Sequence, residues 1–277
     1  MSAADAGRVT VLGGSGFIGS HVARHLRRLG VACDTPARDD ESIFSRPLGH
    51  VIYAIGLTAD FRARPLETVE AHVCLLRRLI AGGGFSSLTY LSSTRVYAGS
   101  ADTRETAPLR VCPAEPGDLY NLSKLTGEAL CLSAGRAAAK VVRLSSVVGL
   151  PAAADSFIGQ LLDEGRRSGR VLFRTTAASR KDYLWVGDAA EAIGRIALSP
   201  ESGIFNLASG AGTANREIAQ ALAAELGFEV AFAADAAVWD FAAIDVSRAK
   251  TRFGFAPRRF AEFFPEFLRA CRTNQGR

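Results

Sequence analysis

Short apolar runs alternate with segments of helical periodicity through the first half of the chain. The apolar runs predict strands at residues 9–12, 31–37, 50–55, 87–92 and 140–148. Apolar positions at helical spacing predict helices at residues 20–29, 65–81 and 120–134. Because strands joined by crossover helices build a parallel sheet, the pattern predicts an α/β fold with a doubly wound parallel sheet.

The pattern loosens after residue 150. It predicts helices and one short strand at residues 157–168, 171–173, 188–198, 215–226 and 260–271. We therefore divide the chain into a sheet domain, residues 1–150, and a smaller C-terminal region, residues 151–277, some of whose segments return to the sheet domain. The sequence has no repeat and no obvious flexible linker, so we expect the two parts to share an interface with a cleft.

The composition is that of an ordinary globular protein. The 277 residues are 48% hydrophobic and 22% charged, which excludes a disordered chain and a disulfide-stapled miniprotein. The five cysteines are odd in number and scattered, which favours reduced buried thiols over a metal site. Neither a long apolar run nor a signal peptide is recognisable, so we expect a cytoplasmic protein.

The net charge of +5 is compatible with nucleic acid, a membrane surface or an anionic small molecule as partner. The arginines occur mostly as isolated pairs, at residues 27–28, 77–78, 166–167 and 258–259. Nucleic-acid-binding proteins more often carry a continuous basic stripe. We therefore expect a small-molecule substrate, with neither nucleic acid nor a membrane as partner.

Three glycines lie between the first predicted strand and the helix that follows it. Gly13, Gly16 and Gly19 form a G-x-x-G-x-x-G pattern, and Phe17 and Ile18 lie within it. In this position the glycines allow a tight turn, a close approach of backbone to a pyrophosphate and close helix packing. The N-terminus of the helix offers unpaired N–H groups to the anion. We expect these five residues to bind a dinucleotide, so residues 1–150 are a candidate dinucleotide-binding domain.

A second motif places Tyr120 and Lys124 one turn apart on the same face of a predicted helix. A tyrosine hydroxyl is a poor base at neutral pH. Lowering its pKa to about 7 requires about 4 kcal/mol of differential stabilisation of the phenolate. A nearby ammonium group and an oxidised nicotinamide can supply it, which suggests acid/base chemistry beside a redox cofactor.

With residues 91–97, which end another predicted strand, these motifs resemble the extended short-chain dehydrogenase/reductase family, of the NAD-dependent epimerase/dehydratase type. The resemblance extends over nearly the whole chain and includes further segments at residues 53–56, 141–149, 181–188, 204–210 and 244–257. The resemblance implies a Rossmann sheet with a substrate-binding C-terminal region, and a homodimer. It also implies that Tyr120 is the acid/base, that Lys124 holds the cofactor ribose, and that Ser93 hydrogen-bonds the reacting oxygen.

The same resemblance bears on the choice between NAD and NADP as cofactor. At the end of the second strand the family usually places an acidic residue for the ribose hydroxyls of NAD, or an arginine for the extra phosphate of NADP. An ungapped count places Arg38 there, which favours NADP over NAD, although Asp34, Asp39 and Asp40 are close enough for a one-residue shift to reverse this. Only residues 39–49 precede the next predicted strand, so the family's usual third strand is expected to be missing.

At other positions the chain departs from the family pattern in residues that bear on the reaction. The family's dehydratases carry Asp-Glu after the catalytic hydroxyl residue, and this chain has Thr94 and Arg95 there, which disfavours a 4,6-dehydratase. The cysteine of the fucose-synthase type is also replaced by Arg95. What remains is redox chemistry at one carbon, by an epimerase that retains its cofactor or by a reductase that exchanges it.

Substrate-binding positions match less well. Thr94, Ser146 and Lys181 are the candidates; Ser146 stands where many of these enzymes have Asn, and Lys181 replaces an Arg. Three arginines could complete an anion site: Arg143, Arg174 and Arg180. His72, where the family usually has Asn, is expected to be a packed helix histidine.

The family resemblance favours a nucleotide sugar as substrate. Two alternatives remain open. One is an NADPH-dependent reductase of a non-sugar carbonyl compound, and the other is a non-catalytic dinucleotide-binding sensor. The presence of Ser93, Tyr120 and Lys124 together argues against the sensor, which would commonly have lost one of them.

Overall fold

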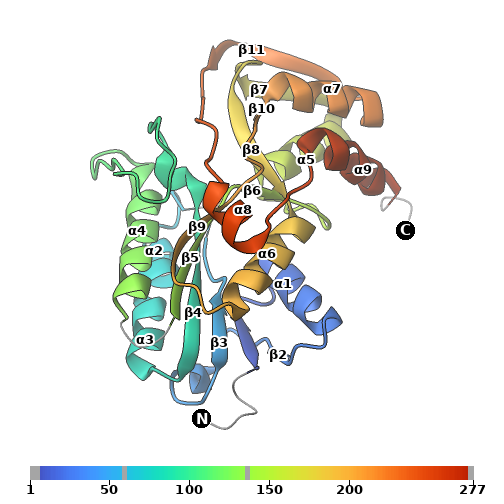
Figure 1. The fold of residues 1–277 in the computed structure, drawn as a ribbon. Helices are drawn as coiled ribbons and strands as arrows, with labels where there is room; N and C mark the ends of the chain where they lie inside the picture. Colours follow the sequence, from blue (N-terminus) through green and yellow to red (C-terminus); the bar gives the residue numbers. More distant parts are fainter. Residues whose placement is uncertain (1–6, 58–60, 135–137, 274–277) are drawn as a thin grey trace.

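The computed structural model describes residues 7–57, 61–134 and 138–273. A six-stranded parallel sheet lies at its centre, with strand order β2-β1-β3-β4-β5-β9 (Figure 1). In chain order the strands are β1 (Val9–Leu12), β2 (Cys33–Asp34), β3 (Gly49–Tyr53), β4 (Phe85–Ser93), β5 (Ala138–Leu144) and β9 (Gly203–Leu207). The α/β fold with a parallel Rossmann-type sheet is therefore confirmed.

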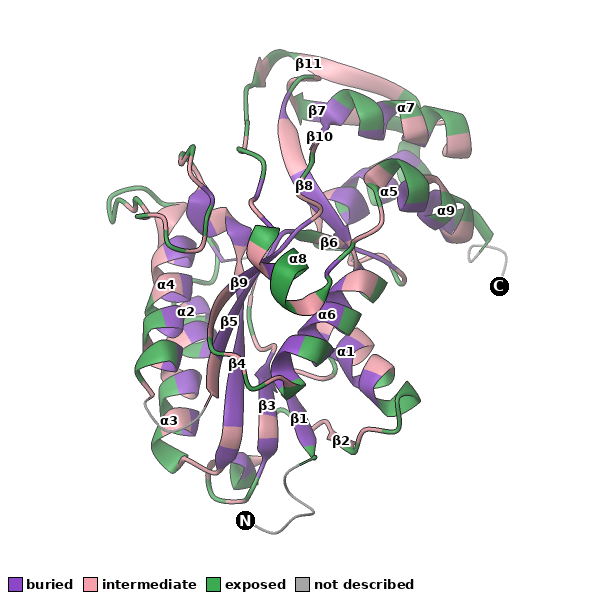
Figure 2. Ribbon diagram, viewed as in Figure 1, coloured by how far each residue is buried: buried purple, intermediate pink, exposed green. Residues whose placement is uncertain are grey.

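Helices cover both faces of this sheet. One face carries α1 (Phe17–Arg28) and α6 (Val186–Leu198); the other carries α2 (Pro65–Val69), the π-helical turn η2 (Glu70–Cys74), α3 (Leu75–Gly82) and α4 (Asp118–Ser133). Strand residues alternate between the two faces. Val9 and Val11 pack with α1 and α6, whereas Leu12 packs with the other layer. β1 is consequently buried along its whole length, and β3, β4 and β5 are mostly buried (Figure 2).

The C-terminal region contains two small sheets and its own apolar core. One sheet has the order β10-β8-β6, and the other pairs β11 with β7. These elements and their helices are β6 (Ser146–Val148), α5 (Phe157–Ser168), β7 (Arg170–Thr175), β8 (Arg180–Trp185), β10 (Gly212–Ala214), α7 (Asn215–Leu226), β11 (Glu229–Ala237) and α9 (Phe260–Thr273). The helix α8 (Ser247–Phe253) instead packs against β9 and α6 of the central sheet layer. Phe263, Phe264 and Phe267 of α9 are buried in the core with Phe173 of β7.

Several strands differ from the sequence-based expectation. β8, β9, β10 and β11 were not predicted as strands, because polar or small residues interrupt their apolar pattern. The single strand expected at residues 140–148 is two strands. β5 stays in the central sheet and pairs with β9, whereas β6 leaves it and pairs with β8.

The second strand is much shorter than expected. Residues 31–37 were predicted, but only Cys33 and Asp34 pair with β1. Pro36 cannot donate a hydrogen bond to a sheet, and the Cys33 carbonyl accepts bonds from Arg27 of α1. Only the short 3-10 helix η1 (Glu41–Phe44) lies between β2 and β3. The expected absence of a further strand in this interval is thus confirmed, and β2 is the sheet edge.

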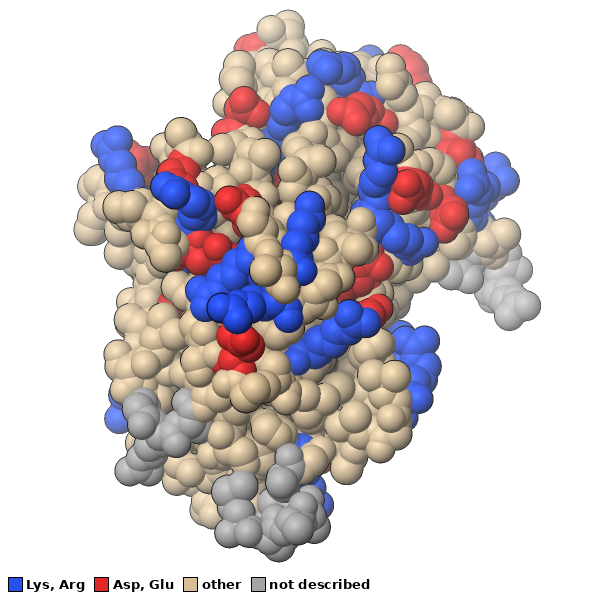
Figure 3. Space-filling view, viewed as in Figure 1, with Lys and Arg blue, Asp and Glu red and all other residues tan. Residues whose placement is uncertain are grey.

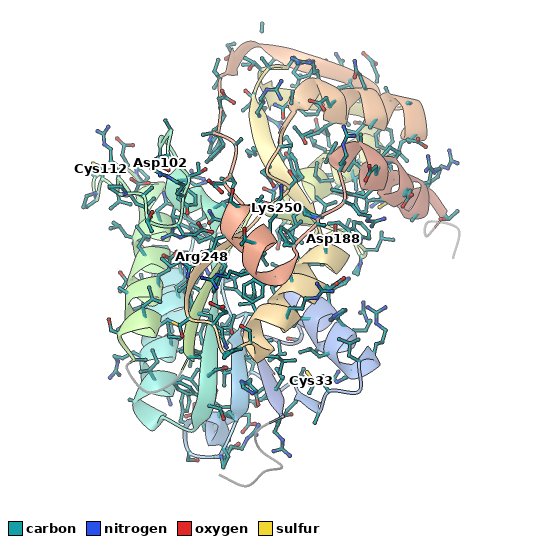
Figure 4. All side chains as sticks on the ribbon, viewed as in Figure 1. Cys33, Asp102, Cys112, Asp188, Arg248 and Lys250 are labelled. Carbon is teal, nitrogen blue, oxygen red and sulfur yellow. The ribbon has the colours of Figure 1, made fainter. Side chains whose placement is uncertain are left out.

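The cysteines are all free thiols, as expected, but not all are buried. Cys131 and Cys271 lie in the core, Cys33 and Cys74 are half-buried, and Cys112 is exposed on the loop before α4 (Figure 4). Basic and acidic side chains are interspersed on the face shown in Figure 3. None of the helices in the described part of the chain is long and apolar enough to span a bilayer.

Candidate active site

The glycine loop forms a close-packed turn between β1 and α1. Gly13 has φ +82°, and a Cβ there would lie 2.8 Å from the Ala54 carbonyl oxygen. A Cβ on Gly19 would collide with the Gly13 carbonyl oxygen, to which the Gly16 N–H donates at 3.0 Å. Gly16 is the N-cap of α1 and supplies no side chain to cap the first N–H groups. This backbone cradle fits the pyrophosphate of a dinucleotide.

A fourth glycine was overlooked from the sequence. A Cβ on Gly14 would lie 2.6 Å from the Thr35 side chain, so glycine is needed where the loop meets the end of β2. Phe17 and Ile18 are the first two residues of α1, and both are half-buried. The ring of Phe17 packs edge-on against His21, whose Nε2 is 2.9 Å from the Leu150 carbonyl oxygen. The start of α1 is thus tied to the segment that leads into the C-terminal region.

Strand β4 and helix α4 bring the proposed Ser-Tyr-Lys residues to one end of the sheet. Ser93 is the last residue of β4, and its Oγ accepts a hydrogen bond from the Arg95 N–H at 3.2 Å. Lys124 Nζ donates to the carbonyl of Leu91, two residues before Ser93, at 3.0 Å. The same Nζ lies 5.9 Å from the centre of the Tyr120 ring, as expected for neighbours on one helix face.

Lys124 is buried at the centre of this cluster. Burial lowers the pKa of its ammonium group to about 7, although the carboxylate of Glu128 acts in the opposite direction. Glu128 lies one turn further along α4 and therefore on the same face. Near neutral pH the charge of Lys124 is therefore sensitive to any anion or hydrogen-bond acceptor that enters the site.

Glu128 belongs to a buried ion pair that connects α4 with the sheet. Arg143 of β5 donates to both of its carboxylate oxygens, at 2.7 Å from Nη2 and 3.0 Å from Nε. Ser92, next to Ser93, donates to Glu128 at 2.5 Å. A further Arg143 nitrogen donates at 2.7 Å to the hydroxyl of Tyr97. Arg143, considered above for an anion site, is therefore fully engaged within the fold.

Two aromatic rings pack on Tyr120. Phe61 lies 5.1 Å away, and His72 packs edge-on at 5.4 Å between ring centres. His72 lies in the π-helical turn η2, is fully buried, and its Nδ1 is 2.9 Å from the Ser123 hydroxyl. Burial and the nearby Lys124 ammonium hold the pKa of His72 well below its usual value, so the ring is neutral. The expectation of a packed helix histidine is met, and the packing is against the candidate acid/base.

The family of the chain follows from a sequence comparison. The model of the NAD dependent epimerase/dehydratase family matches residues 9–208, which include the glycine loop, Ser93, Tyr120 and Lys124. The chain belongs to that family. No curated protein matches the sequence of this family member significantly.

Solved structures of other proteins share the fold. MoeE5 in complex with UDP-glucose and NAD is 21% identical, with a TM-score of 0.85 over 98% of this chain and 100% of that chain. A UDP-galactose 4-epimerase is 23% identical, with a TM-score of 0.79 over 96% and 99%. The dTDP-glucose 4,6-dehydratase DesIV from Streptomyces venezuelae is 20% identical, with a TM-score of 0.82 over 97% and 98%. Epimerases and dehydratases thus occur on the same fold.

The candidate substrate residues of this family member come from three elements. Thr94 is buried at the start of the 3-10 turn η3 (Thr94–Tyr97), directly after β4. Ser146 is exposed at the start of β6. Lys181 of β8 is partly buried, with Nζ 4.9 Å from the Phe157 ring centre and 4.7 Å from that of Trp239. The Lys181 ammonium group therefore lies beside the Trp239 ring. Trp239 was not among the residues singled out from the sequence.

The other two arginines considered for an anion site differ from each other. Arg174 is exposed on β7, whereas Arg180 donates to the Gly212 carbonyl at 2.8 Å and so helps to join β8 and β10. Arg38 is exposed in the loop after β2. Of its acidic neighbours, Asp34 is paired with Arg46 at 2.6 Å, and Asp40 caps η1 by accepting from the Ser42 N–H at 3.0 Å.

Proposed function

We propose that the protein is an NAD(P)-dependent oxidoreductase or epimerase that moves a hydride at a carbinol or keto carbon of a nucleotide sugar. The observation that carries the proposal is the placement of Tyr120 and Lys124 on one face of α4, beside the end of β4 and on the same fold as a glycine cradle for a dinucleotide. MoeE5 and DesIV, which have similar folds, have been solved in complex with NAD. MoeE5 has also been solved in complex with UDP-glucose and with UDP-glucuronic acid.

In the proposed mechanism Tyr120 transfers the proton on the reacting oxygen of the substrate. Lys124 holds the ribose of the cofactor and, when charged, favours the phenolate form of the tyrosine. The Ser93 hydroxyl donates a hydrogen bond to the same substrate oxygen. A bound nicotinamide would accept or return the hydride at the adjoining carbon. Neutral His72 and Phe61 exclude water from one side of the tyrosine ring.

Redox chemistry at one carbon is favoured over 4,6-dehydration. Elimination of water needs an acid and a base beside the substrate, and the Asp-Glu positions of the dehydratases are occupied here by Thr94 and Arg95. Neither side chain carries a carboxylate. We further infer a homodimer of such subunits, as the family resemblance implies.

The cofactor preference we propose is NADP. The carboxylates of Asp34 and Asp40 are engaged by Arg46 and by the Ser42 N–H, which leaves them poorly placed to receive two ribose hydroxyls. Arg38 is exposed nearby, and Arg27 reaches the same loop, donating to the Thr35 hydroxyl at 3.0 Å. Guanidinium groups suit a phosphate monoester.

The decisive experiment identifies the dinucleotide. Freshly purified protein is denatured, the released small molecules are analysed by mass spectrometry, and an emptied sample is titrated with NAD(H) and NADP(H). An empty site that binds NADPH supports an exchanging reductase. Stoichiometric retained NAD supports an epimerase that keeps its cofactor and contradicts the NADP preference. Failure to bind either dinucleotide contradicts the enzyme proposal.

A further inference from the structure

Arg95 places a positive charge beside the candidate acid/base. Its guanidinium carbon lies 5.9 Å from the ring centre of Tyr120, 5.2 Å from that of Phe61 and 5.8 Å from that of Trp239. Its Nε is buried without a hydrogen-bond partner among the described residues. One terminal nitrogen makes a long contact of 3.5 Å with the Gly117 carbonyl. The guanidinium group thus has unused donors in an aromatic surrounding.

Lys181 brings a second cation to the same place from the C-terminal region. Its Nζ and the Arg95 guanidinium both lie within 6 Å of the Trp239 ring centre, at 4.7 and 5.8 Å. The chain passes between β11 and α8 at this point (Figure 1). There the Trp239 carbonyl accepts from the Arg180 N–H at 3.1 Å, and the Trp239 N–H donates to the Ser179 hydroxyl at 2.9 Å. Burial lowers the pKa of Lys181, and the charge of Arg95 lowers it further.

Neither cation is neutralised by the nearby acids. Within residues 7–57, 61–134 and 138–273, no ion pair involves Arg95 or Lys181. Asp118 is close enough to raise the pKa of Arg95, but its two oxygens accept from the Cys112 N–H and the Asn121 side chain. Asp182 points away from Lys181 and accepts bonds from residues 209–210.

Partly buried cations without counterions are costly, and an anionic ligand between them offsets that cost. The resemblance places Lys181 at a substrate-binding position that the family fills with Arg. Arg95 instead follows the turn that carries Ser93 and adjoins Tyr120, where the reacting part of the substrate would lie. A planar guanidinium group pairs in a bidentate manner with a planar carboxylate.

We propose that Arg95 binds a carboxylate on the reacting sugar ring, so that the substrate is a nucleotide-linked uronic acid and not a neutral hexose. This inference rests on the proposed function. Arg95 is then the residue that determines substrate specificity, in the position where dehydratases of the family carry an acid.

The test is calorimetric titration of the dinucleotide-loaded protein with UDP-glucuronate, UDP-glucose and UDP. Wild-type protein should bind UDP-glucuronate at least about tenfold more tightly than UDP-glucose, as for a charge-assisted pair in a site with few competing waters. Arg95→Gln should remove this preference while leaving the affinity for UDP within about twofold. Arg62→Gln is the matched control, because Arg62 is an exposed neighbouring cation that stacks on the same Phe61 ring as Arg95, at 4.7 Å.

Equal binding of the two sugars by the wild type would overturn the inference and leave the nucleotide-sugar proposal intact. A loss of UDP affinity in Arg95→Gln, with an unchanged circular dichroism spectrum, would assign Arg95 to the diphosphate and overturn it as well. A preference that disappears in Arg62→Gln would have the same consequence. If UDP and both sugars fail to bind the loaded wild type, the nucleotide-sugar proposal fails, and this inference fails with it.

Discussion

At the scale of single residues, the site depends on charged side chains that are buried or partly buried. Lys124 is a buried ammonium, Arg95 is a partly buried guanidinium, and the neutral ring of His72 packs edge-on against Tyr120. Buried charges are unfavourable in the free protein, and they are strong binding partners for the ligand that neutralises them.

Replacement of Tyr120 by Phe tests the acid/base role. The change removes one hydroxyl from a ring whose packing against Phe61 and His72 is retained. We expect turnover to fall by at least about two to four orders of magnitude, the usual contribution of general acid/base catalysis. Cofactor affinity, measured by fluorescence titration, should change by no more than a few fold. Turnover close to that of the wild type would contradict the role assigned to Tyr120.

The buried charge of Lys124 should make stability depend on pH. The folded-state pKa of about 7 lies below the ordinary value of 10.5, so the unfolded chain binds the proton more tightly between these values and stability rises with pH across that range. Lys124→Met removes this effect. The stability of the variant relative to wild type should therefore decrease by about 2–3 kcal/mol from pH 6 to pH 9 in urea denaturation.

The control is Lys250→Met, because Lys250 is an exposed lysine on α8 (Figure 4). It should show no comparable change with pH. A pH-independent difference between Lys124→Met and wild type would show that Lys124 titrates normally in the folded protein. The variant should also bind the dinucleotide more weakly, because the proposed contact with the ribose is lost.

At the scale of elements, the site is the meeting point of α4, β4 and β5. The Glu128–Arg143 pair joins the catalytic helix to the sheet, and Ser92 fixes the carboxylate beside the strand that ends at Ser93. The glycine loop similarly determines how closely α1 approaches β1 and β3. These contacts determine how α4 and α1 are oriented relative to the sheet.

A double-mutant cycle tests the ion pair. Glu128→Gln or Arg143→Met alone leaves one buried partner without its counterpart, and each should destabilise the protein by about 3–5 kcal/mol. The double variant should be more stable than the sum of the single effects predicts, by about 1 kcal/mol or more. Urea denaturation of the four proteins measures this coupling. Simple additivity would show that the pair does not act as a unit.

Two substitutions distinguish the roles of the loop glycines. Gly19→Ala forces a methyl group into the Gly13 carbonyl and should destabilise the fold by about 1–3 kcal/mol. A Cβ on Gly16 has only one contact of 3.2 Å, with the Gly13 carbonyl oxygen. Gly16→Ala should therefore fold with nearly unchanged stability but bind the dinucleotide weakly. Equal dinucleotide affinity of Gly16→Ala and wild type would exclude Gly16 from the cradle.

At the scale of the whole molecule, the sheet and the C-terminal region supply different sides of the site. The cofactor loop, Tyr120 and Lys124 belong to the central sheet and its helices, whereas Lys181 and Trp239 come from the smaller sheets and the loop after β11. A ligand that touches both parts should stabilise the whole molecule.

Thermal unfolding tests the cofactor preference at this scale. NADP at a hundred times its dissociation constant should add about 2.7 kcal/mol to the free energy of unfolding, and NAD at the same concentration should add less. Arg38→Ala should remove the difference between the two dinucleotides. A larger shift of Tm with NAD than with NADP would contradict the proposed preference.

The sequence by itself determined the class of fold and the positions of the residues on which the proposed chemistry rests. Strand-helix alternation predicts the parallel sheet, and short-range spacing suffices for the glycine loop and for Tyr120 and Lys124, because one turn of helix places residues four apart on the same face. The absence of a further strand between β2 and β3 is visible too, since few residues separate these two strands. Such features depend on neighbours along the chain.

Tertiary structure alone decided the remaining features. From the sequence alone Arg143 is a candidate anion ligand. The structure shows that it is paired with Glu128, fifteen residues earlier in the chain. Arg95, Lys181 and Trp239 lie far apart in the sequence, and no periodicity connects them. Their convergence depends on β8 and the loop after β11 packing over the end of β4, and the free energy of burying the Phe-rich C-terminal core drives that packing.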